Sequence, residues 1–181
     1  MATKVSRGLV IDASIARAAG GEDAIFPTSK NCRDFLKTVL KVCHRIVMTS
    51  DISDEWNRNQ SNFARLWRVS MVARKKMIPL YDISNDELRN KIQRINVSES
   101  NRKAMRKDII LIEAAIATDF TIIALDETVR KFYSKAANTV GELKIIVWVN
   151  PDYENEQPLI WLENGAKNEK KRRLGFYTKD I

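Results

Sequence analysis

The sequence predicts an α/β fold in which helices lie on both sides of a mainly parallel sheet of four or five strands. Two observations lead to this prediction. Short apolar runs without polar alternation recur along the chain, and such runs are typical of strands buried on both faces. Between them lie longer segments whose apolar residues repeat every three or four positions, as on amphipathic helices. Strands that alternate with helices favour a parallel sheet covered on both faces.

Four apolar runs are strong strand candidates, and each is followed by a polar residue. In chain order, these runs are residues 9–11, 46–48, 121–125 and 145–149. A fifth run, residues 78–81, is a weaker candidate. Because Pro79 cannot donate a hydrogen bond to a neighbouring strand, it predicts a position at the edge of the sheet.

Helical patterns fill most of the intervals between the strands. The apolar spacing places them at residues 34–43, 56–77, 85–95, 108–118 and 127–137. Strands and helices together predict one domain over residues 1–149. Residues 150–181 are predicted to form a C-terminal extension that has a turn, a short apolar patch and a basic, mobile end.

Composition limits the class of protein. Hydrophobic residues make up 44% of the 181 residues, yet no charge-free apolar run approaches the roughly 18 residues needed to cross a bilayer. The two cysteines, Cys32 and Cys43, are too few for a disulfide framework and lack a zinc-site spacing. A cytoplasmic location without a membrane partner is therefore expected. The single histidine, His44, excludes a multi-histidine metal site and disfavours a Ser-His-Asp enzyme.

The net charge of +8 is unevenly distributed. Three segments, residues 57–80, 102–107 and 167–173, carry net charges of +6, +4 and +4, so the remainder of the chain is acidic. Basic blocks with acidic points elsewhere suit a polyanion partner, such as RNA, and a separate centre that attracts metal ions. The alternative interpretation of each single block is a solvated helix face.

Four carboxylates are expected to meet at the edge of the sheet where the strands end. Asp12 and Asp126 each follow a buried run directly. Asp108 is expected to open the helix that leads to the third run, and Glu55 lies near the start of the helix that follows Met48. In open α/β sheets, ligands bind beyond the carboxyl ends of the strands. Taken singly, each acid could instead be a helix cap or turn residue.

Clustered carboxylates without histidine or thiolate partners favour Mg²⁺ or Mn²⁺ as the bound ion. One or two such ions activate water and stabilise the oxygens that enter and leave during phosphodiester cleavage. Basic side chains would hold the RNA backbone. Four of them are spaced so that one long helix would carry them on one stripe. The candidates for nucleic-acid binding are this stripe, Arg58, Arg65, Arg68 and Lys75, together with Arg102 and Lys103. An equally good interpretation of the stripe is a charged helix face that only keeps the protein soluble.

The acidic positions resemble the motifs of PIN-domain nucleases. The segment Val10-Ile11-Asp12-Ala13-Ser14 resembles the opening D-x-S/N motif of that family. Thr49-Ser50 followed by Glu55 is similar to the second acidic position. Asp108, with the alanine-rich helix and the strand that lead to Asp126, resembles the third and fourth. The resemblance spans about residues 7–149, and it departs from the family pattern at Ala124, where Thr or Ser is common.

The resemblance implies a three-layer α/β/α fold and a Mg²⁺- or Mn²⁺-dependent endoribonuclease that acts on single-stranded RNA, usually as a homodimer. It also implies a possible VapC-like toxin with an antitoxin protein as partner. By this likeness, Asp12, Glu55, Asp108 and Asp126 would hold the metal, and Ser14 and Thr128 would support the site. Two alternatives remain open. One is a non-catalytic RNA- or protein-binding module of the same fold. The other is a phosphotransfer domain with Asp12 as nucleophile, which Ser14 disfavours because no D-x-D motif is present.

Overall fold

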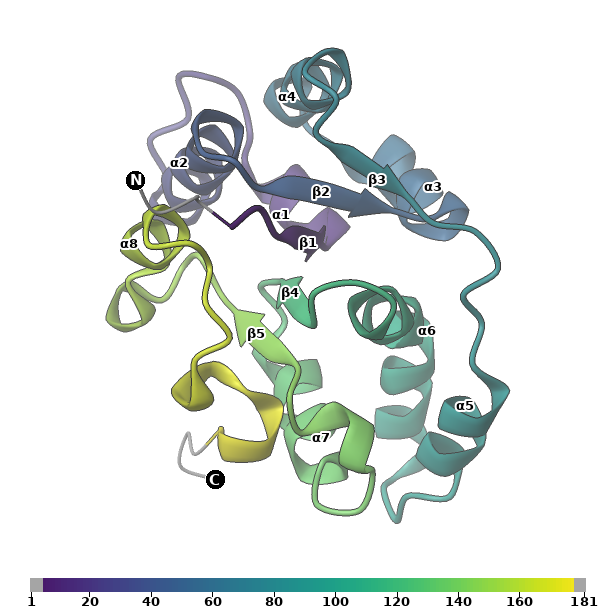
Figure 1. The fold of residues 1–181 in the computed structure, drawn as a ribbon. Helices are drawn as coiled ribbons and strands as arrows, with labels where there is room; N and C mark the ends of the chain where they lie inside the picture. Colours follow the sequence, from purple (N-terminus) through teal and green to yellow (C-terminus); the bar gives the residue numbers. More distant parts are fainter. Residues whose placement is uncertain (1–4, 178–181) are drawn as a thin grey trace.

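The structure is a computed structural model, and it describes residues 5–177. Five parallel strands form one sheet in the order β3-β2-β1-β4-β5, which confirms the predicted α/β class. Helices flank this sheet on both sides, and Figure 1 shows α1, α2 and α4 on one side and α6 and α7 on the other. The strands are β1 Gly8–Ile11, β2 Arg45–Met48, β3 Met77–Pro79, β4 Thr121–Ile123 and β5 Val147–Val149.

The strands agree with the predicted apolar runs in position, although β4 and β5 are shorter than expected. All residues of β1, β4 and β5 are buried, as expected of strands that are covered on both faces. β3 lies at the edge of the sheet, and Pro79 at its end is exposed, as the proline predicted. This arrangement places the carboxyl ends of all five strands along one edge of the sheet.

Eight α-helices and four short 3₁₀ helices (η1–η4) connect and follow the strands within residues 5–177. The α-helices are α1 Ala13–Ala18, α2 Pro27–Lys41, α3 Ser50–Asn59, α4 Asn62–Ala73, α5 Asp86–Gln93, α6 Glu99–Ile116, α7 Glu127–Ala136 and α8 Pro158–Glu163. The 3₁₀ helices are η1 Gly141–Leu143, η2 Glu154–Glu156, η3 Lys170–Arg172 and η4 Leu174–Phe176.

The long helix predicted over residues 56–77 is wrong, because two helices occupy this range. Gln60 is extended, and Ser61 caps the second helix by accepting a hydrogen bond from Ala64 N. The two helices pack on each other through Trp56 and Trp67, whose stacked rings have centroids 5.9 Å apart. Because the chain changes direction at Gln60, the basic residues of this range do not form one stripe.

Residues 150–177, which were predicted as a C-terminal extension with a mobile end, pack onto the rest of the described chain. Trp161 and Leu162 on α8 are buried, and α8 lies against α2 (Figure 1). The buried His44 ring places Nε2 2.9 Å from Leu162 O, which is a structural role. Arg172, from the basic block, is also buried and pairs with Glu169 at 2.8 Å. Residues 178–181 of the predicted mobile end lie outside the described residues.

Within residues 5–177, no helix has the length and apolar character needed to pass through a bilayer. The Cys32 side chain is a buried thiol. Burial raises the pKa of the Cys32 thiol to about 12, so this thiol is unreactive at neutral pH.

Candidate active site

The strand order defines where a ligand is expected to bind. Strands β1 and β4 are neighbours in the sheet. From β1 the chain continues outward to β2 on one side, and from β4 it continues outward to β5 on the other. The connections therefore reverse direction between β1 and β4, and a crevice forms beyond the ends of these two strands. A pocket of about 180 Å³ opens at this point. All four predicted acids line it: Asp12, Glu55, Asp108 and Asp126. We call it the acid pocket.

Two of the acids are placed by the strands that they follow. The backbone N–H of Asp12 donates to Ile123 O at 2.9 Å, which holds the end of β1 beside the end of β4. Its Oδ2 accepts from Ser14 N at 3.0 Å and caps α1. Asp126 caps α7 in the same way, since its Oδ1 accepts from Val129 N at 2.9 Å. Both acids are thus cap residues, and they lie at the switch point as well.

The other two acids come from the middle of helices. Glu55 lies in the second half of α3, and the neighbouring Trp56 ties this helix to the sheet by donating from Nε1 to Ile11 O at 2.9 Å. Asp108 lies in the middle of α6, so the prediction that it opens the helix is wrong. The helix begins nine residues earlier, where Ser98 accepts from Asn101 N at 3.3 Å. Packing of α3 beside α6 brings these two side chains together.

The two predicted supporting residues have different positions. Ser14 lines the acid pocket, and its Oγ lies 3.4 Å from the backbone N of Leu125. It therefore links the helix after β1 to the loop after β4. Thr128 is exposed on the first turn of α7 and does not line the pocket. The structure therefore supports a structural role at the site for Ser14 alone.

The acid pocket concentrates negative charge, because four carboxylates and two cations line it. None of the four carboxylates forms an ion pair with any residue from 5 to 177. Burial, followed by repulsion from Asp12, raises the pKa of Asp108 from its ordinary 3.8 to about 7. Asp126 and Glu55 raise this pKa further, whereas Lys107 lowers it. Asp108 therefore binds a proton near neutral pH unless a cation takes its place.

The donor set of the pocket suits Mg²⁺ or Mn²⁺. All four acidic side chains offer hard oxygen ligands, and these ions prefer such ligands. In the described part of the chain, no three acidic, histidine or cysteine side chains already converge on one point as metal ligands do. The oxygen chemistry of the four acids fits a divalent ion, whereas their arrangement is not that of a preformed set of metal ligands.

Three further polar side chains line the pocket, and the sequence prediction missed them: Arg17, Asn59 and Lys107. The helical spacing contained the signal for two of them. Arg17 follows Ser14 by three residues, and Asn59 follows Glu55 by four, so each pair shares a helix face. Arg17 and Lys107 form no ion pair with the described residues, although four carboxylates line the same pocket. They are placed to contact an anionic ligand.

The six predicted RNA-binding residues lie elsewhere, because none of them lines the acid pocket. Arg65 and Arg68 line a separate groove of about 500 Å³ between α3 and α4, and Arg68 donates to Asn57 Oδ1 at 3.0 Å. Arg102 pairs with Glu99 at 2.9 Å and so stabilises the start of α6. The remaining three are exposed and lie outside both cavities: Arg58, Lys75 and Lys103.

Neither a protein-family model nor a curated protein sequence matches this chain.

Proposed function

We propose that this protein is a Mg²⁺- or Mn²⁺-dependent endoribonuclease that hydrolyses phosphodiester bonds in single-stranded RNA. The observation that carries the proposal is the acid pocket, where four carboxylates that form no ion pair within residues 5–177 line one crevice at the β1–β4 switch point. The order and spacing of these acids in the sequence resemble those of PIN-domain nucleases, which supports the same conclusion. The net charge of +8 favours a polyanionic substrate.

The residues of the pocket divide the chemical task between them. The four carboxylates would hold the divalent ion, which supplies Lewis-acid activation of water and of the phosphodiester group when it is bound. Arg17 and Lys107 would contact the non-bridging oxygens of the phosphate, and Asn59 would donate from its amide. Ser14 would support the site by linking α1 to the loop after β4, since its Oγ accepts from Leu125 N.

The proposal is tested by incubating the purified chain with a mixed-sequence single-stranded RNA in Mn²⁺, in Mg²⁺ and in EDTA. We expect cleavage in at least one of the two metals and none in EDTA, because the proposed mechanism activates water at a bound divalent ion. A duplex of the same sequence is the control for strand preference. RNA that stays intact in both metals, or that is cut equally in EDTA, would contradict the proposal.

Replacing Lys107 by Ala, or Arg17 by Ala, is expected to raise KM for RNA about tenfold and to change kcat less. A charge-assisted hydrogen bond contributes roughly 1.5–3 kcal/mol, and a contact made equally in the ground and transition states affects KM. The matched control is Arg106→Ala, which removes a neighbouring cation of α6 that donates to Gln93 at 2.8 Å. Steady-state kinetics on all three variants should separate the pocket cations from Arg106. Equal KM values for all of them would exclude the assigned contacts.

A non-catalytic RNA-binding module is the second candidate function. It is favoured by the cap roles of Asp12 and Asp126, since a residue that caps a helix has a structural reason to be present. In that case the chain would bind RNA without cutting it, and Mn²⁺ would leave the thermal unfolding midpoint unchanged. The homodimer, the antitoxin partner and the cytoplasmic location stay predictions from the sequence, and light scattering of the purified chain measures the first.

A further inference from the structure

A second cleft lies between the loop after β5 and the last described turn of the chain. Its volume is about 560 Å³, and three aromatic side chains line it: Tyr153, Phe176 and Tyr177. We call it the aromatic cleft. No aliphatic side chain lines it, whereas the acid pocket has no aromatic lining. The two cavities differ in chemistry, because aromatic side chains line the aromatic cleft but not the acid pocket, whereas carboxylates line both.

One residue, Glu127, joins the aromatic cleft to the acid pocket. Glu127 directly follows Asp126 of the acid pocket in the chain. Its Oε2 accepts a hydrogen bond from the Tyr177 hydroxyl at 2.6 Å, and its Oε1 accepts from Asn150 Nδ2 at 3.1 Å. Asn150 Nδ2 also lies 3.3 Å from Leu125 O, at the end of β4. An extended ligand bound at the acids would therefore reach the aromatic cleft along the carboxyl edge of the sheet.

Buried charges hold the walls of the aromatic cleft in place. Arg130 is 1% exposed, and its Nη1 lies 3.2 Å from Glu127 and 2.5 Å from Glu156. The other oxygen of Glu156 lies 3.8 Å from Arg172, which is also buried. The Arg130 guanidinium also lies 4.1 Å from the centre of the Tyr177 ring. A ligand that enters walls fixed in this way loses little free energy to ordering them.

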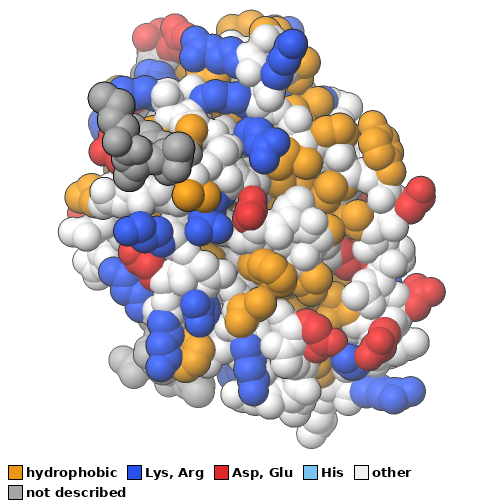
Figure 2. Space-filling view, in the orientation of Figure 1, with side chains coloured by type: hydrophobic (Ala, Val, Ile, Leu, Met, Phe, Trp, Pro, Cys, Tyr) orange, Lys and Arg blue, Asp and Glu red, His pale blue; other side chains and the backbone are white. Residues whose placement is uncertain are grey.

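The charges of the lining decide which part of a nucleotide can enter. Three carboxylates, those of Asp152, Glu154 and Glu156, line the cleft and repel phosphate groups. A nucleobase is uncharged and stacks on aromatic rings irrespective of sequence. The phosphates would lie at the mouth of the cleft, where Lys171 lines it with a side chain that is 71% exposed. Figure 2 shows Lys and Arg side chains gathered over this C-terminal segment, at the lower left, around an apolar spot.

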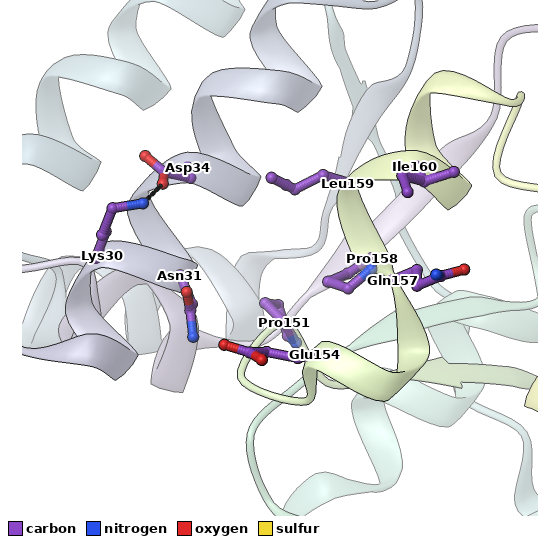
Figure 3. A pocket seen from close by; sticks show the side chains of 9 residues that line it. All are labelled: Lys30, Asn31, Asp34, Pro151, Glu154, Gln157, Pro158, Leu159 and Ile160. Carbon is purple, nitrogen blue, oxygen red and sulfur yellow. Dashed lines mark hydrogen bonds and ion pairs between the residues drawn. The ribbon is translucent and has the colours of Figure 1, made fainter.

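We propose that the aromatic cleft binds an unpaired nucleobase of the RNA strand whose phosphodiester lies in the acid pocket. This inference rests on the proposed ribonuclease function. The pocket of about 310 Å³ between α2 and α8 is a poorer base site, because prolines and aliphatic side chains form its apolar wall and no aromatic ring lines it (Figure 3). An organic cation is a poorer ligand for the aromatic cleft, since Arg130 and Lys170 already contact the Tyr177 and Phe176 rings.

The experiment measures RNA binding without cleavage. The full chain carrying Asp12→Asn is titrated in EDTA with a fluorescently labelled 12-nucleotide RNA and with a series in which one nucleotide at a time is abasic. We expect one abasic position to weaken binding about fivefold or more, because its base can no longer stack. Adding Phe176→Ala should weaken binding of the intact RNA by a similar factor. In that variant, the abasic position should weaken binding no further. The matched control is Tyr81→Ala, which removes an aromatic side chain that is 78% exposed on the β3–α5 connection.

Three outcomes are decisive. The base site would be overturned if the abasic position weakened RNA binding as much with Phe176→Ala as without it. Displacement of the RNA by a trimethyllysine peptide, but not by adenosine monophosphate, would overturn it in favour of a cation site. A third outcome separates the two proposals. If Phe176→Ala abolishes the effect of one abasic position, but the chain with Asp12 intact shows no metal-dependent cleavage, the base site is retained and the proposed catalysis is removed.

Discussion

Replacing Asp12 by Asn is expected to reduce metal-dependent cleavage of single-stranded RNA by more than about 100-fold. Even residues that only support metal ligands change activity by about 10–100-fold when they are replaced, and Asp12 is assigned as a direct ligand. The fold should survive, because the Asn side chain also has an oxygen that can accept the 3.0 Å hydrogen bond from Ser14 N and cap α1. The loss would therefore report on chemistry rather than on folding.

A pair of adjacent acids sharpens this test. Glu55 lines the acid pocket, whereas its neighbour Asp54 is exposed and does not line it. Glu55→Gln should lower the cleavage rate strongly, and Asp54→Asn should leave it within a factor of about two, because surface substitutions have small effects. Initial rates in Mn²⁺, with circular dichroism to confirm folding, measure both. Equal rates for Asp12→Asn and the unmodified chain would rule out the assigned site.

In EDTA, the free energy of unfolding is expected to fall by up to about 4 kcal/mol as the pH rises from about 4 to above 7. The reason is that the pKa of Asp108 is raised from 3.8 to about 7 in the folded chain. The folded chain then binds the Asp108 proton more tightly than the unfolded chain does. This contribution to stability is complete below pH 3.8 and is lost as the pH rises through 7. Asn at this position has no proton to lose.

Urea unfolding at pH 4.5, 6 and 8 measures this effect for the unmodified chain and for Asp108→Asn. The two unfolding free energies should diverge as the pH rises, with Asp108→Asn the more stable variant at pH 8. Adding Mn²⁺ at pH 8 should restore stability to the unmodified chain and have less effect on Asp108→Asn, because a bound cation stabilises the folded state. Parallel pH profiles for the two chains in EDTA would show that the pKa of Asp108 is not raised in the folded chain.

The sheet and the approach of Asp12 to Asp126 could be predicted because both depend on short sequence patterns within the strands. Uninterrupted apolar runs are stable only when both faces are covered, so the central strands and the edge position of Pro79 could be predicted from the residues alone. Asp12 and Asp126 follow such runs directly, and the carboxyl ends of parallel strands share one edge. The approach of Asp12 to Asp126 follows from these two facts, without any knowledge of the helices.

Helix boundaries were less predictable, because caps and tertiary packing decide them. The apolar spacing continues from Trp56 into α4, yet the Ser61 cap and the Trp56–Trp67 contact divide the segment into two helices. The start of α6 was missed because residues 99–103, its first turn, are all polar, so that no apolar repeat marks them. The cap residue Ser98 was the available signal.

By itself, the sequence determined the fold class, the central strands and the positions of Asp12 and Asp126 at the ends of β1 and β4, because each of these follows from residues close together in the chain. Only the tertiary structure decided what surrounds the acids. Arg17 and Lys107 enter the pocket from helices on different sides of the sheet, and residues 150–177 fold back to place Tyr177 beside Glu127. Such contacts join segments that are distant in the chain, and they form only when burial of apolar side chains and pairing of buried charges fix how the segments pack.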